Sequence, residues 1–123
     1  MAATRVEQTY QILRGLVNNV PDIEGAALVS TDGLVMSSVL PGGTDEDRVS
    51  AMAAALLSLG ERTAQELARG ELEQVYVKGS NGYVILMQAG TDGVLEAIAG
   101  PQAKIGMVLL EMKRASQSIA RVL

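Results

Sequence analysis

The stretch TDEDRVSAMAAALLSLGERTAQELARG, residues 44–70, decides the fold that this sequence predicts. It opens with a typical helix start, because Thr44 is a favoured N-cap residue and Asp47, three residues on, can reach back to it. The acidic side chains of residues 45–47 also suit the positive end of a helix dipole. We therefore expect a long helix that begins at Thr44.

This helix is apolar or small on two sides rather than one. At 100° per residue, one stripe should face a sheet, and it holds Val49, Met52, Ala53, Leu56, Thr63, Ala64 and Leu67. The middle of the opposite side carries only small residues, namely Ala51, Ala54, Ala55 and Ser58. Two interpretations stay open. Either a second partner packs on that side, or alanine occupies exposed positions because it is the best helix former.

Short β-branched runs lie on both sides of this helix. Before it, residues 25–30 and 34–40 are joined through Asp32-Gly33, a typical hairpin signal. After it, residues 72–79, 83–89 and 94–99 are joined by short links that contain glycine, which favours an antiparallel meander. Apolar residues at helical spacing predict a first helix over residues 4–20 and a last helix that includes residues 105–119. Gly15 interrupts the first helix, either as a packing point or as a weak spot.

The expected order is therefore helix, two strands, helix, three strands, helix. A five-stranded antiparallel sheet with helices on both faces satisfies this order, so the sequence predicts the α+β class. At 123 residues and with no linker or repeat, we expect a single domain over residues 1–123.

Composition excludes several classes of function. The chain has no cysteine and no histidine, which removes disulfides, thiolate chemistry, imidazole bases and the zinc sites built on them. A net charge of −4, no Phe or Trp and only three Tyr argue against nucleic-acid binding. The chain shows neither a signal peptide nor an apolar run long enough to span a membrane, so we expect a cytoplasmic protein.

Catalytic, cofactor and metal sites are not expected. Only a Ser–Lys pair could act as a nucleophile and base, and Lys78, Lys104 and Lys113 are interpreted as solvated. The Gly42-Gly43 pair precedes a helix start, but the acidic residues that follow would repel a phosphate. Those carboxylates also lack the alternating spacing of a calcium loop.

Four stretches resemble the roadblock/dynein light-chain family, which is related in fold to longin and profilin-like domains. They are the hairpin ALVSTDGLVMSS, the helix start TDEDRVSAMAAALL, the segment RGELEQVYVKGSNGYVILMQAG and the ending IGMVLLEMKRASQSIARVL. Together they cover nearly the whole chain, and the spacing between them carries most of the resemblance.

The resemblance implies a homodimer or heterodimer in which two middle helices pack side by side. The strands that follow these helices would pair and make one continuous sheet. Carried over to this sequence, the interface falls in residues 49–67 and 72–79, and its expected members are Val49, Ala51, Met52, Ala54, Ala55, Leu56, Ser58, Leu59, Val75, Tyr76 and Val77.

The resemblance also implies a function. Bacterial members resemble regulators of small Ras-like GTPases, and eukaryotic relatives are dynein light chains and scaffolds. We expect a non-catalytic dimeric module that binds and regulates or scaffolds a small Ras-like GTPase through exposed positions of the middle helix, with Asp47, Arg48, Arg62 and Gln65 as candidates. A sensor domain that binds a small ligand between sheet and helix stays open as the alternative, although the expected core offers few polar groups for a ligand.

Overall fold

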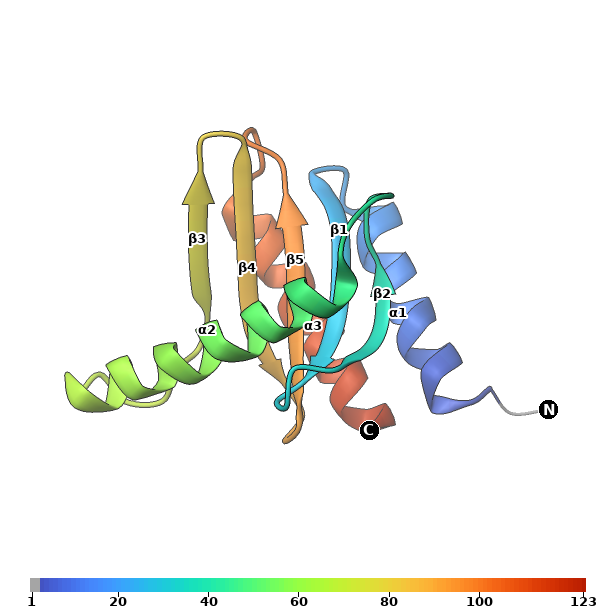
Figure 1. Ribbon diagram of the computed structural model, residues 1–123. Helices are drawn as coiled ribbons and strands as arrows, with labels where there is room; N and C mark the ends of the chain where they lie inside the picture. The colour runs from blue at the N-terminus through green and yellow to red at the C-terminus, as the bar shows by residue number, and fades with distance from the viewer. Residues whose placement is uncertain (1–2) are drawn as a thin grey trace.

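The computed structural model describes residues 3–123 (Figure 1). Its elements follow the expected order: α1 (Arg5–Asn19), β1 (Ile23–Ser30), β2 (Val35–Val39), α2 (Glu46–Glu66), β3 (Val75–Gly79), β4 (Gly82–Ala89), β5 (Gly93–Ala99) and α3 (Ile105–Val122). The α+β class is confirmed.

All five strands form one antiparallel sheet in the order β2-β1-β5-β4-β3. The hairpin and the meander are confirmed, since β1 pairs with β2 and β4 pairs with both β3 and β5. The two outer strands of the meander differ in their surroundings. β5 lies at the centre of the sheet, whereas β3 forms an edge with β4 as its strand neighbour.

Helices cover both faces of the sheet (Figure 1). The helices α1 and α3 pack together on one face, over a core that includes Leu13, Leu28, Ile85 and Met112. On the other face α2 crosses the strands over a smaller core of six buried residues, which are Ala27, Val29, Ala53, Leu57, Leu86 and Val94. The end of α2 extends past β3 in Figure 1, so the sheet supports only part of this helix.

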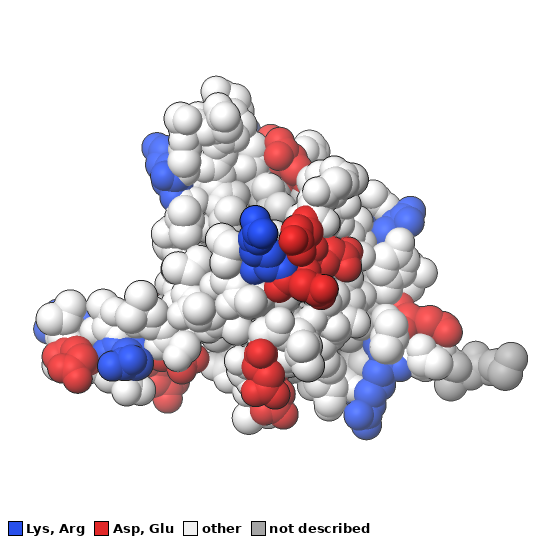
Figure 2. Space-filling model, in the orientation of Figure 1, with Lys and Arg blue, Asp and Glu red and all other residues white. Residues whose placement is uncertain are grey.

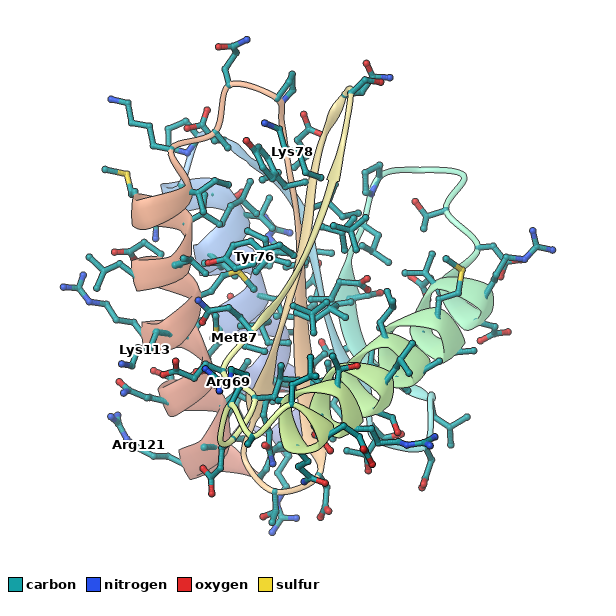
Figure 3. The ribbon with its side chains drawn as sticks, turned by 90° about the vertical axis from the view of Figure 1, so that its left-hand side faces the viewer. Arg69, Tyr76, Lys78, Met87, Lys113 and Arg121 are labelled. Carbon is teal, nitrogen blue, oxygen red and sulfur yellow. The ribbon has the colours of Figure 1, made fainter. Side chains whose placement is uncertain are left out.

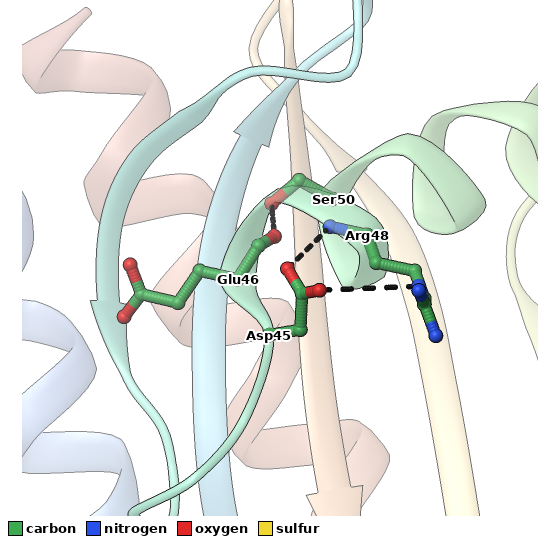
Figure 4. A network of polar contacts seen from close by, with 4 residues as sticks. All are labelled: Asp45, Glu46, Arg48 and Ser50. Carbon is green, nitrogen blue, oxygen red and sulfur yellow. Dashed lines mark hydrogen bonds and ion pairs between the residues drawn. The ribbon is translucent and has the colours of Figure 1, made fainter.

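The start of α2 differs from the expectation by one residue. Asp45 is the N-cap, and its carboxylate accepts a hydrogen bond from the backbone N–H of Arg48 at 3.1 Å (Figure 4). Thr44 instead donates its hydroxyl to the carbonyl oxygen of Pro41 at 2.6 Å. The Thr44 hydroxyl is therefore used by the turn before the helix. Asp45, the next residue and also of a favoured capping type, caps the helix instead.

The buried side of α2 is also shifted from the expected stripe. Its fully buried residues are Ser50, Ala53 and Leu57, whereas Met52 and Leu67 are exposed. Burial of Ser50 is tolerated because its hydroxyl donates to the carbonyl oxygen of Glu46 at 2.6 Å (Figure 4). The small side chains at positions 50 and 53 allow α2 to lie close to the sheet.

Candidate interaction surface

The outward side of α2 is an exposed surface of small and apolar side chains. Met52, Leu59 and Leu67 are each more than half exposed. The remaining predicted interface positions on this helix are exposed at Ala51, Ala55 and Ser58 and half-buried at Val49, Ala54 and Leu56. Figure 2 shows that most of this face is uncharged and that its charged side chains gather mainly near the two ends of α2.

Strand β3 continues this surface at the edge of the sheet. Along this strand, Val75 is half-buried and Val77 is 42% exposed. On the opposite face of the strand, Tyr76 is 45% exposed. An edge strand with apolar side chains and unpaired backbone groups is a template for pairing with another chain.

Gly60 lies where α2 contacts the β3 part of this surface. A Cβ atom at this position would lie 3.0 Å from Val75 Cγ2 and 3.1 Å from Leu72 Cδ2, closer than ordinary van der Waals contact, so glycine suits the close approach of α2 to these two side chains. Beside this contact lies an open apolar groove of about 410 Å³, lined chiefly by Leu56, Leu59, Thr63, Ala64, Leu67, Leu72 and Val75. Predicted interface residues from the helix and the strand are therefore brought together.

The predicted partner-binding residues Asp47, Arg48, Arg62 and Gln65 are all exposed. Arg48 contacts Asp45 at 3.9 Å in an exposed pair, which contributes little to stability. Within one protomer the four residues do not gather. Arg62 lies fifteen positions beyond Asp47, which corresponds to about 22 Å along a helix.

Glu96 is a buried polar residue whose burial the sequence did not predict. It lies on the central strand, paired across to Ala27 and Leu86, on the face covered by α2. Its side chain is 5% exposed, and its Oε1 atom has no hydrogen-bond partner among residues 3–123. Burial raises the pKa of this carboxyl from its ordinary value of 4.5 to about 7. Alternation in VLEAIA gave no reason to place Glu96 under a helix.

Two searches of residues 3–123 bear on other classes of site. No group of three Asp or Glu side chains in this range is placed to hold a metal ion. Within the same range, each helix is too short or too polar to cross a membrane.

Comparisons with known proteins agree with this geometry. A family profile described as the Roadblock/LC7 domain matches residues 9–99. The uncharacterized protein MJ1340 of Methanocaldococcus jannaschii is 38% identical over 103 residues, which are 84% of this chain and 90% of the relative.

Solved structures share the fold. The crystal structure of a Roadblock/LC7 domain from Streptomyces avermitilis has a TM-score of 0.85 and 29% identity, with 91% of this chain and 94% of that chain covered. A structure described as MglB with tetrameric arrangement has a TM-score of 0.88 and 19% identity, with 99% and 92% covered. Acanthamoeba castellanii profilin II has a TM-score of 0.66 and 16% identity, with 93% and 96% covered. The last two likenesses concern the fold alone.

Proposed function

Since this chain belongs to the Roadblock/LC7 domain family, we propose that it is a non-catalytic, dimeric interaction module for a small Ras-like GTPase. In this proposal residues 1–123 act as a single roadblock-like domain in the cytoplasm. The domain either regulates the GTPase or holds it as a scaffold.

The surface formed by α2 and β3 carries the proposal. An isolated protomer leaves Met52, Leu59 and Val77 exposed, together with the unpaired edge of β3. Large contiguous apolar surfaces of this kind mark interaction sites in soluble proteins. A second copy related by a two-fold axis would pair its β3 with this edge and lay its α2 beside this one. The result is an isologous interface, in which the same surface is used twice.

The two-fold axis also has a consequence for the exposed polar residues of α2. Helices related by an axis perpendicular to them run antiparallel. The Asp47 and Arg48 end of one helix would then lie near the Arg62 and Gln65 end of its partner. Residues that are far apart in one protomer thereby become candidates for one composite surface. Long polar side chains at such a rim mainly set orientation and association rate.

The GTPase partner is inferred from the family resemblance of the sequence. The absence of cysteine and histidine from the chain supports the non-catalytic half of the proposal. Arg48, Arg62 and Arg69 are exposed, and no contact singles one out as an arginine finger for the partner's active site. We therefore propose that any effect on hydrolysis acts through the switch regions of the GTPase itself.

Calorimetry with the cognate GTPase, loaded with GDP or with a non-hydrolysable GTP analogue, tests the proposal. We expect the dimer to bind one nucleotide state more tightly, and Arg62→Glu to weaken that binding. Arg5→Glu, on α1 at the other face, is the matched control and should have no effect. Equal affinity for the two nucleotide states would contradict a role in reading the switch. An apolar metabolite retained by the purified protein, without GTPase binding, would favour the sensor alternative.

A further inference from the structure

Glu96 also bears on how firmly α2 is held on the sheet. Its cross-strand partners on β1 and β4 are Ala27 and Leu86. Both pack in one core with Ala53 and Leu57 of α2, so the carboxyl lies in the contact between the sheet and this helix. β5 is hydrogen-bonded to β1 on one side and to β4 on the other. Of the elements around Glu96, α2 is therefore the one that can move without breaking the sheet.

The attachment of α2 to the sheet is limited. The fully buried residues of this helix are Ser50, Ala53 and Leu57. Figure 3 shows α2 alone on one side of the sheet, whereas α1 and α3 lie together on the other side, over the larger core. The sheet would keep this larger core if α2 moved away from it.

Exposed links with glycine precede and follow α2. Gly43 has a φ of +85° and Gly70 a φ of +89°, and a Cβ added at either position would meet no atom within 4 Å. Residues 41–43 and 68–71 are all exposed. Hinges are a few loop residues of this kind, which absorb changes in backbone angles. The two links are therefore suited to let α2 leave the sheet as an intact helix.

The charged groups around Glu96 do not compensate a charge on its carboxyl. The titratable and charged groups of the elements packed against it are Tyr83 on β4, Glu24 on β1 and, on α2, Glu46, Asp47, Arg48, Glu61, Arg62 and Glu66. Tyr83 packs in the core on the other face, and all the charged ones are exposed. Lys113 and Arg121 belong to α3, on the far side of the sheet (Figure 3). No other described residue donates a hydrogen bond to Glu96 Oε1.

We propose that α2 packs on the sheet while Glu96 is protonated and is released about its glycine links when Glu96 ionises, so that pH controls the surface through which the domain assembles. A buried carboxylate without a partner is costly, and moving α2 away admits water to it. The release of α2 does not depend on the proposed function. Its consequence for assembly does, because that function places α2 in the dimer interface.

The pH range follows from the pKa of this carboxyl in the two states. With α2 released, water hydrates the carboxyl, which ionises near its ordinary pKa of 4.5, whereas burial under α2 raises the pKa to about 7. Below pH 4.5 the carboxyl is protonated in both states, so pH has no effect. As the pH rises from 4.5 to 7, the released state loses the proton first and gains on the packed state. Above pH 7 the total gain levels off at about 300-fold.

Hydrogen exchange followed by mass spectrometry measures the release, with wild type and Glu96→Gln compared at each pH so that the chemical pH dependence of exchange cancels. For amides of residues 50–57, we expect the opening constant of wild type to exceed that of Glu96→Gln by about tenfold at pH 5.5 and about 300-fold at pH 8. Glu61→Gln removes an exposed carboxylate from the same helix and should follow wild type. Amides of α3 should open less readily than those of α2.

Two results of this experiment would overturn the inference. One is a ratio between wild type and Glu96→Gln that stays constant from pH 5.5 to pH 8. The other is equal opening constants for α2 and α3, because the chain would then open as one unit and not about the links of α2.

Analytical ultracentrifugation tests the consequence for assembly. Affinity falls with the fraction of chains in the binding-competent state, so between pH 5.5 and pH 8 the dissociation constant of the dimer should rise at least about threefold more for wild type than for Glu96→Gln. Release of α2 without this difference would overturn the control of assembly. A monomer at every pH would overturn the proposed dimer, and the control of assembly with it, and leave the release of α2 standing.

Discussion

Replacing Glu96 with glutamine should stabilise the fold at neutral pH. The wild-type carboxyl is buried, its Oε1 atom has no partner in the described part of the chain, and burial raises its pKa to about 7. In the unfolded chain the same carboxyl ionises near its ordinary pKa of 4.5. Glutamine has the same shape as the protonated acid but cannot ionise, so it removes the cost of placing a charge under α2.

The direction of the pH dependence follows from the raised pKa. Below pH 4.5 the carboxyl is protonated in both states and contributes no difference between wild type and Glu96→Gln. Between pH 4.5 and 7 the unfolded wild-type chain releases this proton while the folded chain retains it, so wild-type stability falls as pH rises. A difference of 2.5 pK units corresponds to about 3 kcal/mol at 1.36 kcal/mol per unit. The advantage of glutamine should be about 2 kcal/mol at pH 6 and about 3 kcal/mol from pH 7 upward.

Urea unfolding at one fixed protein concentration, from pH 4 to pH 8, measures this difference. The exposed Glu61→Gln is the matched control, because it removes a carboxylate that water already solvates. Wild-type and Glu96→Gln stabilities that stay parallel across this pH range would refute the reasoning, since a group titrating identically in both states cannot change stability with pH.

Three further substitutions test the packing and the surface. Leu57→Ala should cost about 2–5 kcal/mol in urea unfolding, because Leu57 is buried between α2 and the sheet. Gly15→Ala should raise stability by up to about 1 kcal/mol in the same assay, because the added Cβ meets only Asn19 Nδ2, at 3.8 Å. Ala55→Arg, at an exposed position on the outward side of α2, should convert the proposed dimer to a monomer in light scattering while circular dichroism stays unchanged. A dimeric Ala55→Arg would remove α2 from the interface.

Local patterns in the sequence were sufficient for the order of the elements. The change from helical to alternating periodicity places all eight elements in order, and the glycine-containing links identify the hairpin and the meander, whereas the central pairing of β1 with β5 joins distant segments and was not predicted. Gly15 illustrates what a single sequence leaves open. Its role as a packing point or a weak spot depends on its surroundings, and the structure shows only an ordinary contact there.

The errors have a common physical origin in packing between distant segments. The stripe on α2 assumed that a sheet lies under the whole helix, but the helix extends past β3, so Thr63 and Leu67 are exposed. The stripe at 100° per residue placed Met52 inward, but Met52 is exposed and Ser50 is buried instead, with its hydroxyl donating to the Glu46 carbonyl oxygen. Glu96 was missed because only the central position of β5 and the path of α2 determine its burial. The partner-binding residues stay predictions, because a protomer alone does not test them.

The end of α2 beyond β3 also bears on the lifetime of unassembled chains. Residues 61–69 are exposed apart from the half-buried Ala64, so the hydrogen bonds of the helix itself hold most of this segment. Helix ends without tertiary support open readily, and open segments exchange amide hydrogens and enter protease active sites. A second copy that covers Leu59 and Leu67 would oppose this local opening, so amide exchange in the segment should slow as protein concentration rises. Proteases would then remove lone subunits and spare assembled ones, which couples the abundance of this protein to its state of assembly.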